Sequence, residues 1–123
     1  MQFVNMEVWK RSRLLAIALY REMAELRDFG FKDQITRSAL SVPSNIAEGL
    51  ERGTNPDKCR FIEYAKGSVA ELRTQIDIGI EIGYIPIDIG KKWIKECCEL
   101  SLMLVGLIRT LKNKSRIELH EAE

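Results

Sequence analysis

The sequence has little of the residue types on which catalysis and disulfide frameworks depend. It contains one histidine, three cysteines and three prolines among 123 residues. The single histidine, His120, lies far in sequence from any cysteine, which disfavours a catalytic triad. Cys97 and Cys98 are adjacent and the number of cysteines is odd, so we expect no disulfide framework and a reducing, cytoplasmic location. Zinc-type Cys-x-x-Cys spacing and Glu-x-x-His pairs are also missing. We therefore predict a protein that is not an enzyme and holds no metal or other cofactor.

Long apolar runs and an excess of one charge sign are missing too. No run approaches the roughly 18 apolar residues that cross a bilayer, and the start, MQFVNMEVWKRSR, does not resemble a secretion signal. The formal net charge is +1. Residues 1–31 and 32–73 each carry only one more basic than acidic side chain, so they contain no basic arm. We expect no membrane partner, and the overall charge alone does not predict a polyanion as partner.

The composition and the apolar spacing predict a single all-α domain. Hydrophobic residues make up 46% and charged residues 30% of the chain, a mixture typical of one soluble globular domain. Apolar residues recur at steps of three and four, which predicts helices over about 7–28, 33–51, 56–83 and 87–111. The short connections favour an antiparallel up-down-up-down four-helix bundle over residues 1–112, with a polar, frayed tail at 113–123. A dimer of long coiled-coil helices is the weaker alternative.

The expected helix boundaries depend on turn-forming residues. Gly30 is expected to close the first helix in a left-handed conformation, and Asn55 is expected to cap the third, with Pro56 in its first turn. Pro43 interrupts the second helix pattern and removes one helical hydrogen bond, so either the helix kinks or a new helix begins near Ser41.

Some apolar side chains fall outside the predicted core arcs. On the helical wheel they lie away from both the core and the charged arc, on the first and third helices. Single exposed apolar residues are normal, but their recurrence on two helices favours a homo-oligomer. The candidate interface residues are Leu14, Ile17, Tyr64, Ile78 and Ile82.

A polar stripe follows the second helix at steps of three and four. It consists of Gln34, Arg37, Ser38, Ser41, Asn45, Glu48 and Arg52. Serine and asparagine are poor helix formers, so a binding or inter-subunit role is as plausible as a solvated face. Arg37 could pair with Ser41 or with a partner's carboxylate, and Asn45 and Glu48 could satisfy the backbone freed by Pro43. Gly67, Ser68 and Gly79 lie inside a helical pattern, where small residues are expected to admit a neighbouring backbone.

Two motifs resemble a known family. The run SVPSNIAEG at residues 41–49, preceded by Arg37, and the later GS-x-x-EL at residues 67–72 are similar to the four-helix proteins encoded in intervening sequences of bacterial 23S ribosomal RNA genes, also called the S23-type ribosomal protein family. The accessory variability protein of diversity-generating retroelements is similar in fold. The residues that carry the family motif are Arg37, Ser41, Pro43, Asn45, Glu48, Gly49, Gly67, Ser68 and Glu71.

The resemblance implies a continuous but kinked helix through Pro43, a homopentameric ring, and a role around structured RNA or a ribonucleoprotein. Lysine and arginine can neutralise phosphates, so the candidate RNA contacts are Lys10, Arg11, Arg13, Arg37, Arg52, Lys58 and Arg60. For each of them, ordinary surface charge is the competing interpretation. The competing function is a protein-interaction module, such as a retroelement accessory protein that binds a reverse transcriptase, or an assembly with no nucleic-acid role.

Overall fold

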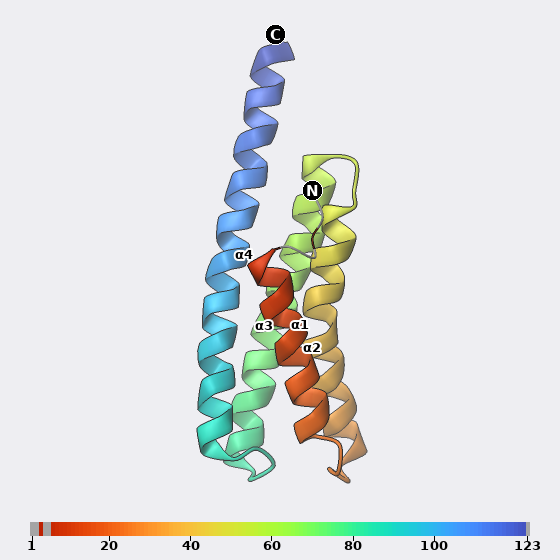
Figure 1. Cartoon of the computed structure of the whole chain (residues 1–123), viewed down its shortest axis with the longest axis vertical. Coiled ribbons are helices and arrows are strands. Elements are labelled where there is room, and N and C mark those ends of the chain that lie inside the picture. The colour runs from red at the N-terminus through yellow and green to blue at the C-terminus, as the bar shows by residue number, and fades with distance from the viewer. Residues whose placement is uncertain (1–2, 4–5, 123) are drawn as a thin grey trace.

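Four helices make up the part of the chain that the computed structural model describes, residue 3 and residues 6–122 (Figure 1). They are α1 (Glu7–Glu22), α2 (Phe29–Leu50), α3 (Asn55–Glu81) and α4 (Ile87–Ala122), and no strand occurs among the described residues. Each helix packs against the next in sequence, and α4 also touches α1 (Figure 1). Successive helices run in opposite directions, so α1 and α3 point the same way. The prediction of an all-α, up-down-up-down bundle is confirmed.

The core lies along the apolar stripes that the spacing predicts. Leu19, Ile46, Leu72 and Leu104 contribute one fully buried side chain from each helix. On α3 the predicted core residue Phe61 is only half-buried, and its neighbour Ile62 takes the buried position. Burying these side chains provides most of the stability of the bundle, at roughly 1.5–3 kcal/mol for each large apolar residue.

The first turn differs from the prediction. α1 ends at Glu22, and Asp28 caps α2 by accepting a hydrogen bond from the Phe31 N–H at 3.1 Å. Gly30 therefore lies in the first turn of α2, and the prediction that it closes the first helix is wrong. The carboxylate of Asp28 also accepts a 2.8 Å hydrogen bond from the hydroxyl of Tyr84, which ties this turn to the α3–α4 turn. These two hydrogen bonds lower the pKa of Asp28, with the backbone N–H as the larger cause.

The other turns follow the predicted positions with one change. Thr54, not Asn55, caps α3, because its hydroxyl accepts from the Asp57 N–H at 3.3 Å. Pro56 occupies the first turn of α3, where its missing N–H costs nothing. Gly83 follows α3 with φ of +83°, a conformation that favours glycine.

α2 is one helix through Pro43. The continuity that the family resemblance implies is confirmed, and the alternative of a new helix near Ser41 is wrong. The backbone carbonyl of Ala39, which Pro43 deprives of its helical donor, is not bonded by the stripe side chains predicted for it. Asn45 instead donates to the carbonyl of Ser41 at 2.8 Å, and Glu48 accepts from Arg52.

The last helix is longer than predicted. Residues 113–122, expected as a frayed tail, continue α4 to Ala122, and this end projects past the α2–α3 turn (Figure 1). At 1.5 Å per residue α4 is about 54 Å long, whereas α1 is about 24 Å. The side chain of His120 lies outside the described residues.

Candidate nucleic-acid interface

Arg11 joins α1 to α4 by two ion pairs. Its guanidinium donates to Glu96, with Nε to Oε2 at 3.0 Å, and to Glu99 at 2.9 Å. The hydrogen bonds to Glu96, the larger cause, and to Glu99 raise the pKa of Arg11. The hydrogen bond from Arg11 in turn lowers the pKa of Glu99. A guanidinium shared by two carboxylates has no excess positive charge for a phosphate. The contacts of Arg11 within the chain therefore fasten α1 to α4.

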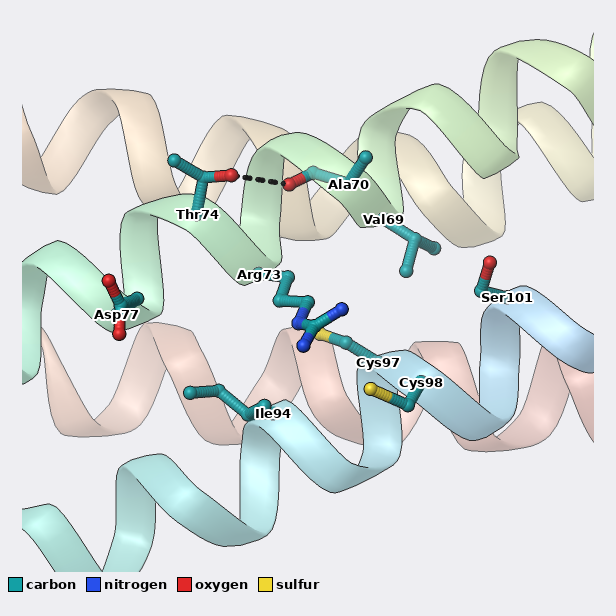
Figure 2. A pocket seen from close by; sticks show the side chains of 9 residues that line it. All are labelled: Val69, Ala70, Arg73, Thr74, Asp77, Ile94, Cys97, Cys98 and Ser101. Atoms are coloured by element: carbon teal, nitrogen blue, oxygen red, sulfur yellow. Dashed lines mark hydrogen bonds between the residues drawn. The ribbon is translucent and has the colours of Figure 1, made fainter.

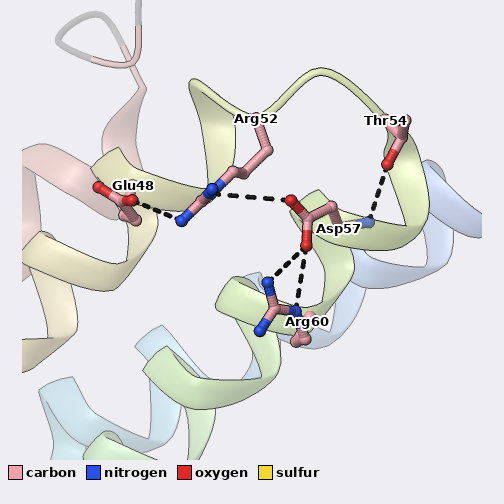
Figure 3. A network of polar contacts seen from close by, with 5 residues as sticks. All are labelled: Glu48, Arg52, Thr54, Asp57 and Arg60. Atoms are coloured by element: carbon pink, nitrogen blue, oxygen red, sulfur yellow. Dashed lines mark hydrogen bonds and ion pairs between the residues drawn. The ribbon is translucent and has the colours of Figure 1, made fainter.

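Arg52 and Arg60 lie in a polar network at the α2–α3 turn (Figure 3). Arg52 donates to Glu48 at 2.7 Å and lies 3.8 Å from Asp57. Arg60 donates to the same Asp57 at 2.6 and 3.1 Å, and this contact raises the pKa of Arg60. Both guanidiniums also face the ring of Phe61, at 4.4 and 4.8 Å from its centroid. Two arginines and two carboxylates neutralise each other here and fasten α2 to α3.

The remaining predicted cations lie on three helices. Lys10 lies 3.9 Å from Glu7, while Arg13, Arg37 and Lys58 form no ion pair with the described residues. Arg37 does not bond to Ser41, whose hydroxyl donates to the carbonyl of Ser38 instead. Of the seven predicted cations, Lys10, Arg11, Arg52 and Arg60 therefore lie beside carboxylates of the same chain.

A basic groove between α3 and α4 was missed by the sequence analysis. Its cavity volume is about 270 Å³, and its charged lining consists of Glu63, Lys66, Arg109, Lys112 and Arg116. None of the four cations forms an ion pair with a described residue. We call this surface the basic groove. The sequence does contain its signal, because residues 100–117 carry Arg109, Lys112, Lys114 and Arg116 and no acidic residue.

The lining of the basic groove matches a phosphate backbone. Its floor is aliphatic, formed by Val105 and Ile108, and no aromatic ring lines it. Proteins that hold single strands usually stack bases on aromatic side chains. Unpaired cations over an aliphatic floor instead suit the phosphates of a folded RNA.

A second cleft between α3 and α4 does not favour chemistry. It has a volume of about 470 Å³, and Figure 2 shows Arg73 of α3 reaching across it toward Cys97 and Cys98 of α4. Burial, more than the nearby Cys98, raises the pKa of Cys97 to about 12. A thiol that stays protonated is a poor nucleophile and a poor metal ligand. Among the described residues, no three histidine, cysteine or acidic side chains come together as a metal site.

An apolar groove lies between α1 and α2. Its lining includes the predicted interface residue Ile17, and its volume is about 330 Å³. Ile17 is half-buried there, while the other four candidate interface residues, Leu14, Tyr64, Ile78 and Ile82, are exposed. No described helix has a stretch long and apolar enough to span a bilayer.

Comparison with known families identifies the chain. The sequence profile of the family described as 23S rRNA-intervening sequence protein matches residues 4–106, which is most of the chain. The chain belongs to this family. A crystal structure of a protein of unknown function from the S23 ribosomal protein family of Bacteroides thetaiotaomicron has the same fold, with a TM-score of 0.77 and 22% sequence identity over 82% of this chain and 97% of that one. No curated protein matches the sequence.

The small residues of the helices have different roles. Gly49 of the family motif is buried against α3, and Gly79 is buried against neighbouring side chains, where close packing was predicted. Gly67 is exposed with open space beside it, so the packing role predicted for it is wrong, and Ser68 merely donates to the carbonyl of Tyr64. The matched span ends at residue 106. Three of the four cations of the basic groove therefore lie beyond it.

Proposed function

We propose that this member of the family is a non-catalytic, self-assembling scaffold of the cytoplasm that binds structured RNA. The observation that carries the proposal is the basic groove, where Lys66, Arg109, Lys112 and Arg116 face one carboxylate, Glu63. The family match covers residues 4–106 and includes Lys66 alone of the four cations, so the proposal rests on the groove itself.

The salt dependence of the expected binding follows from the number of cations. Each phosphate that a cation neutralises releases condensed counterions, so four contacts predict a slope of about −3 in log affinity against log salt concentration. A net charge of +1 adds little long-range attraction, which makes these local contacts the main electrostatic contribution.

The test is a titration of a folded RNA hairpin at several salt concentrations. Lys112→Gln with Arg116→Gln should weaken binding and reduce the slope to about −1.5, because two phosphate contacts are lost. The matched control is Lys91→Gln with Lys92→Gln, which removes two exposed cations near the other end of the same helix. No binding at low salt, or an equal loss in the control, would refute RNA binding through this groove.

Self-assembly is the second part of the proposal. The exposed apolar residues Leu14, Tyr64, Ile78 and Ile82, with half-buried Ile17, support it, since apolar surface outside the core favours association. The family resemblance suggests a ring of five copies. Light scattering at micromolar concentration should give a multiple of 14.1 kDa, whereas a uniform 14.1 kDa species would refute self-assembly.

The apolar α1–α2 groove favours a second candidate function, a protein-interaction module such as a reverse transcriptase accessory protein. Ala16, Ile17, Leu40 and Pro43 provide a surface suited to a protein rather than to a phosphate. Co-purification from the native cell distinguishes the two functions. Recovery of a protein without RNA, together with no RNA binding at low salt, would favour the second.

A further inference from the structure

Two of the apolar surfaces that the described residues leave uncovered are complementary in charge. The first, the α1–α2 groove, is lined by Arg13, Ala16, Ile17, Tyr20, Arg21, Leu40 and Pro43. Tyr20 and Leu40 remain 46% and 49% exposed at its rim. Its only charged lining residues are the two arginines, and neither forms an ion pair with a described residue. The groove therefore suits an apolar surface that carries negative charge.

The second surface, the α3 stripe, follows one face of α3. Its residues recur at steps of four and three, and they are Tyr64, Ser68, Glu71, Gln75, Ile78 and Ile82. Tyr64, Ile78 and Ile82 are 49%, 46% and 52% exposed. Glu71 is the only charged member, and it is exposed although its carboxylate lies 3.5 Å from the hydroxyl of Ser38. The stripe is thus apolar and acidic, where the groove is apolar and basic.

The two surfaces also agree in spacing. Arg13 and Tyr20 are seven residues apart on α1, and Glu71 and Ile78 are seven residues apart on α3, about 10 Å in each case. When two parallel helices place Glu71 opposite Arg13, they place Ile78 opposite Tyr20. A charge pair and an apolar pair form in the same register.

We infer that the α3 stripe of one copy docks in the α1–α2 groove of a second copy, in parallel orientation. The inference rests on the proposed self-assembly and specifies its contact. α1 and α3 do not pack against each other within the bundle, so each copy can use both surfaces at once. α1 and α3 also point the same way within one copy, so neighbouring bundles stay parallel (Figure 1). A contact between two different surfaces of this kind generates a ring when the rotation closes.

The contact uses two of the five candidate interface residues, Ile17 in the groove and Ile78 on the stripe. In this register Tyr64 and Ile82 fall opposite residues 6 and 24, beyond the groove lining at residues 13–21 of α1. Leu14 lines a different surface, beside Arg11 and the start of α4, and takes no part.

Cross-linking between singly substituted chains tests the pairing. Tyr20→Cys and Ile78→Cys are made separately in a Cys98→Ser background, because the other two cysteines are buried. The two variants are mixed in equal amounts, refolded together and oxidised. They should form a disulfide between residues 20 and 78 of different chains. In a random mixture about one contact in four joins the groove of one variant to the stripe of the other and can form this link. Each variant alone should stay unlinked. The matched control pairs Tyr20→Cys with Leu102→Cys, an exposed position on α4, and should give no link.

A charge exchange gives an independent readout. Glu71→Arg and Arg13→Glu should each shift the protein toward monomer in light scattering, and the double variant should recover the assembly. An assembly in which position 20 links to 20, or 78 to 78, would overturn this docking while leaving self-assembly intact. A wild-type protein that stays monomeric would overturn both.

Discussion

At Gly49 the backbone of α2 lies close to α3, and this contact predicts the effect of adding a single methyl group. Gly49 of α2 faces the start of α3. A Cβ added there would lie 2.9 Å from the Cβ of Phe61 and 3.2 Å from the carbonyl oxygen of Lys58. Neither atom can rotate away, because one is a backbone atom and the other is bonded directly to the backbone. Gly49→Ala should therefore push α2 and α3 apart.

The size of the effect combines two opposing contributions. Overpacking a close contact costs about 1–3 kcal/mol, and replacing glycine by alanine inside a helix gains about 1 kcal/mol. Gly49→Ala should lower the free energy of unfolding by about 1 kcal/mol. Gly106→Ala is the matched control, because Gly106 is exposed inside α4 with no atom within 4 Å of an added Cβ. That variant should gain about 1 kcal/mol.

Urea unfolding followed by helical circular dichroism, at one protein concentration, measures both variants. The propensity gain is common to both, so the difference between them, about 2 kcal/mol, isolates the steric contribution. A Gly49→Ala protein as stable as the Gly106→Ala protein would show that α2 and α3 are not as close as described, and the reasoning would fail.

Three further predictions concern charge, thiol reactivity and capping. Arg11→Met should lower the free energy of unfolding at neutral pH. The folded state lowers the pKa of Glu99 through Arg11, so this contact stabilises the protein above the ordinary pKa of a glutamate and stops doing so as the pH falls through the lowered value. Urea midpoints measured at pH 7 and pH 3 should therefore show the difference between variant and wild type shrinking below about pH 4. A thiol reagent at pH 8 should modify half-buried Cys98 first, as followed by mass spectrometry. Burial raises the pKa of Cys97 to about 12, so Cys97 should be modified only as fast as the protein opens. Thr54→Ala should cost about 1 kcal/mol in urea unfolding through loss of the α3 cap, and an unchanged midpoint would contradict that role.

The fold could be predicted from the sequence because apolar spacing determines which helix face is buried. The turns were less predictable, since several residues compete for the same role. Gly30 and Asp28 both fit a helix boundary, and the hydroxyl of Tyr84, 56 residues away, bonds to Asp28 in the folded chain. Likewise Thr54 and Asn55 can both cap a helix, and the backbone path after α2 selects Thr54.

The candidate site could be predicted only in part. Arg11 is neutralised by acidic residues 85 and 88 positions further along the chain, a pairing that no local pattern shows. The basic groove combines Lys66 of α3 with cations of α4, so only folding brings it together. The α4 part of the groove can be recognised in the sequence, because residues 100–117 carry four basic and no acidic side chains. The charge balance of residues 1–73 does not include this stretch.

The length of α4 gives an assembly of parallel bundles a polarity. In the assembly proposed above every copy would point the same way, so the ends of α4 beyond the α2–α3 turn would all emerge on one side (Figure 1). Arg116 and its cationic neighbours would then be repeated around that side. A folded RNA that bound one copy would meet the next at high local concentration, and repetition would make a weak contact avid.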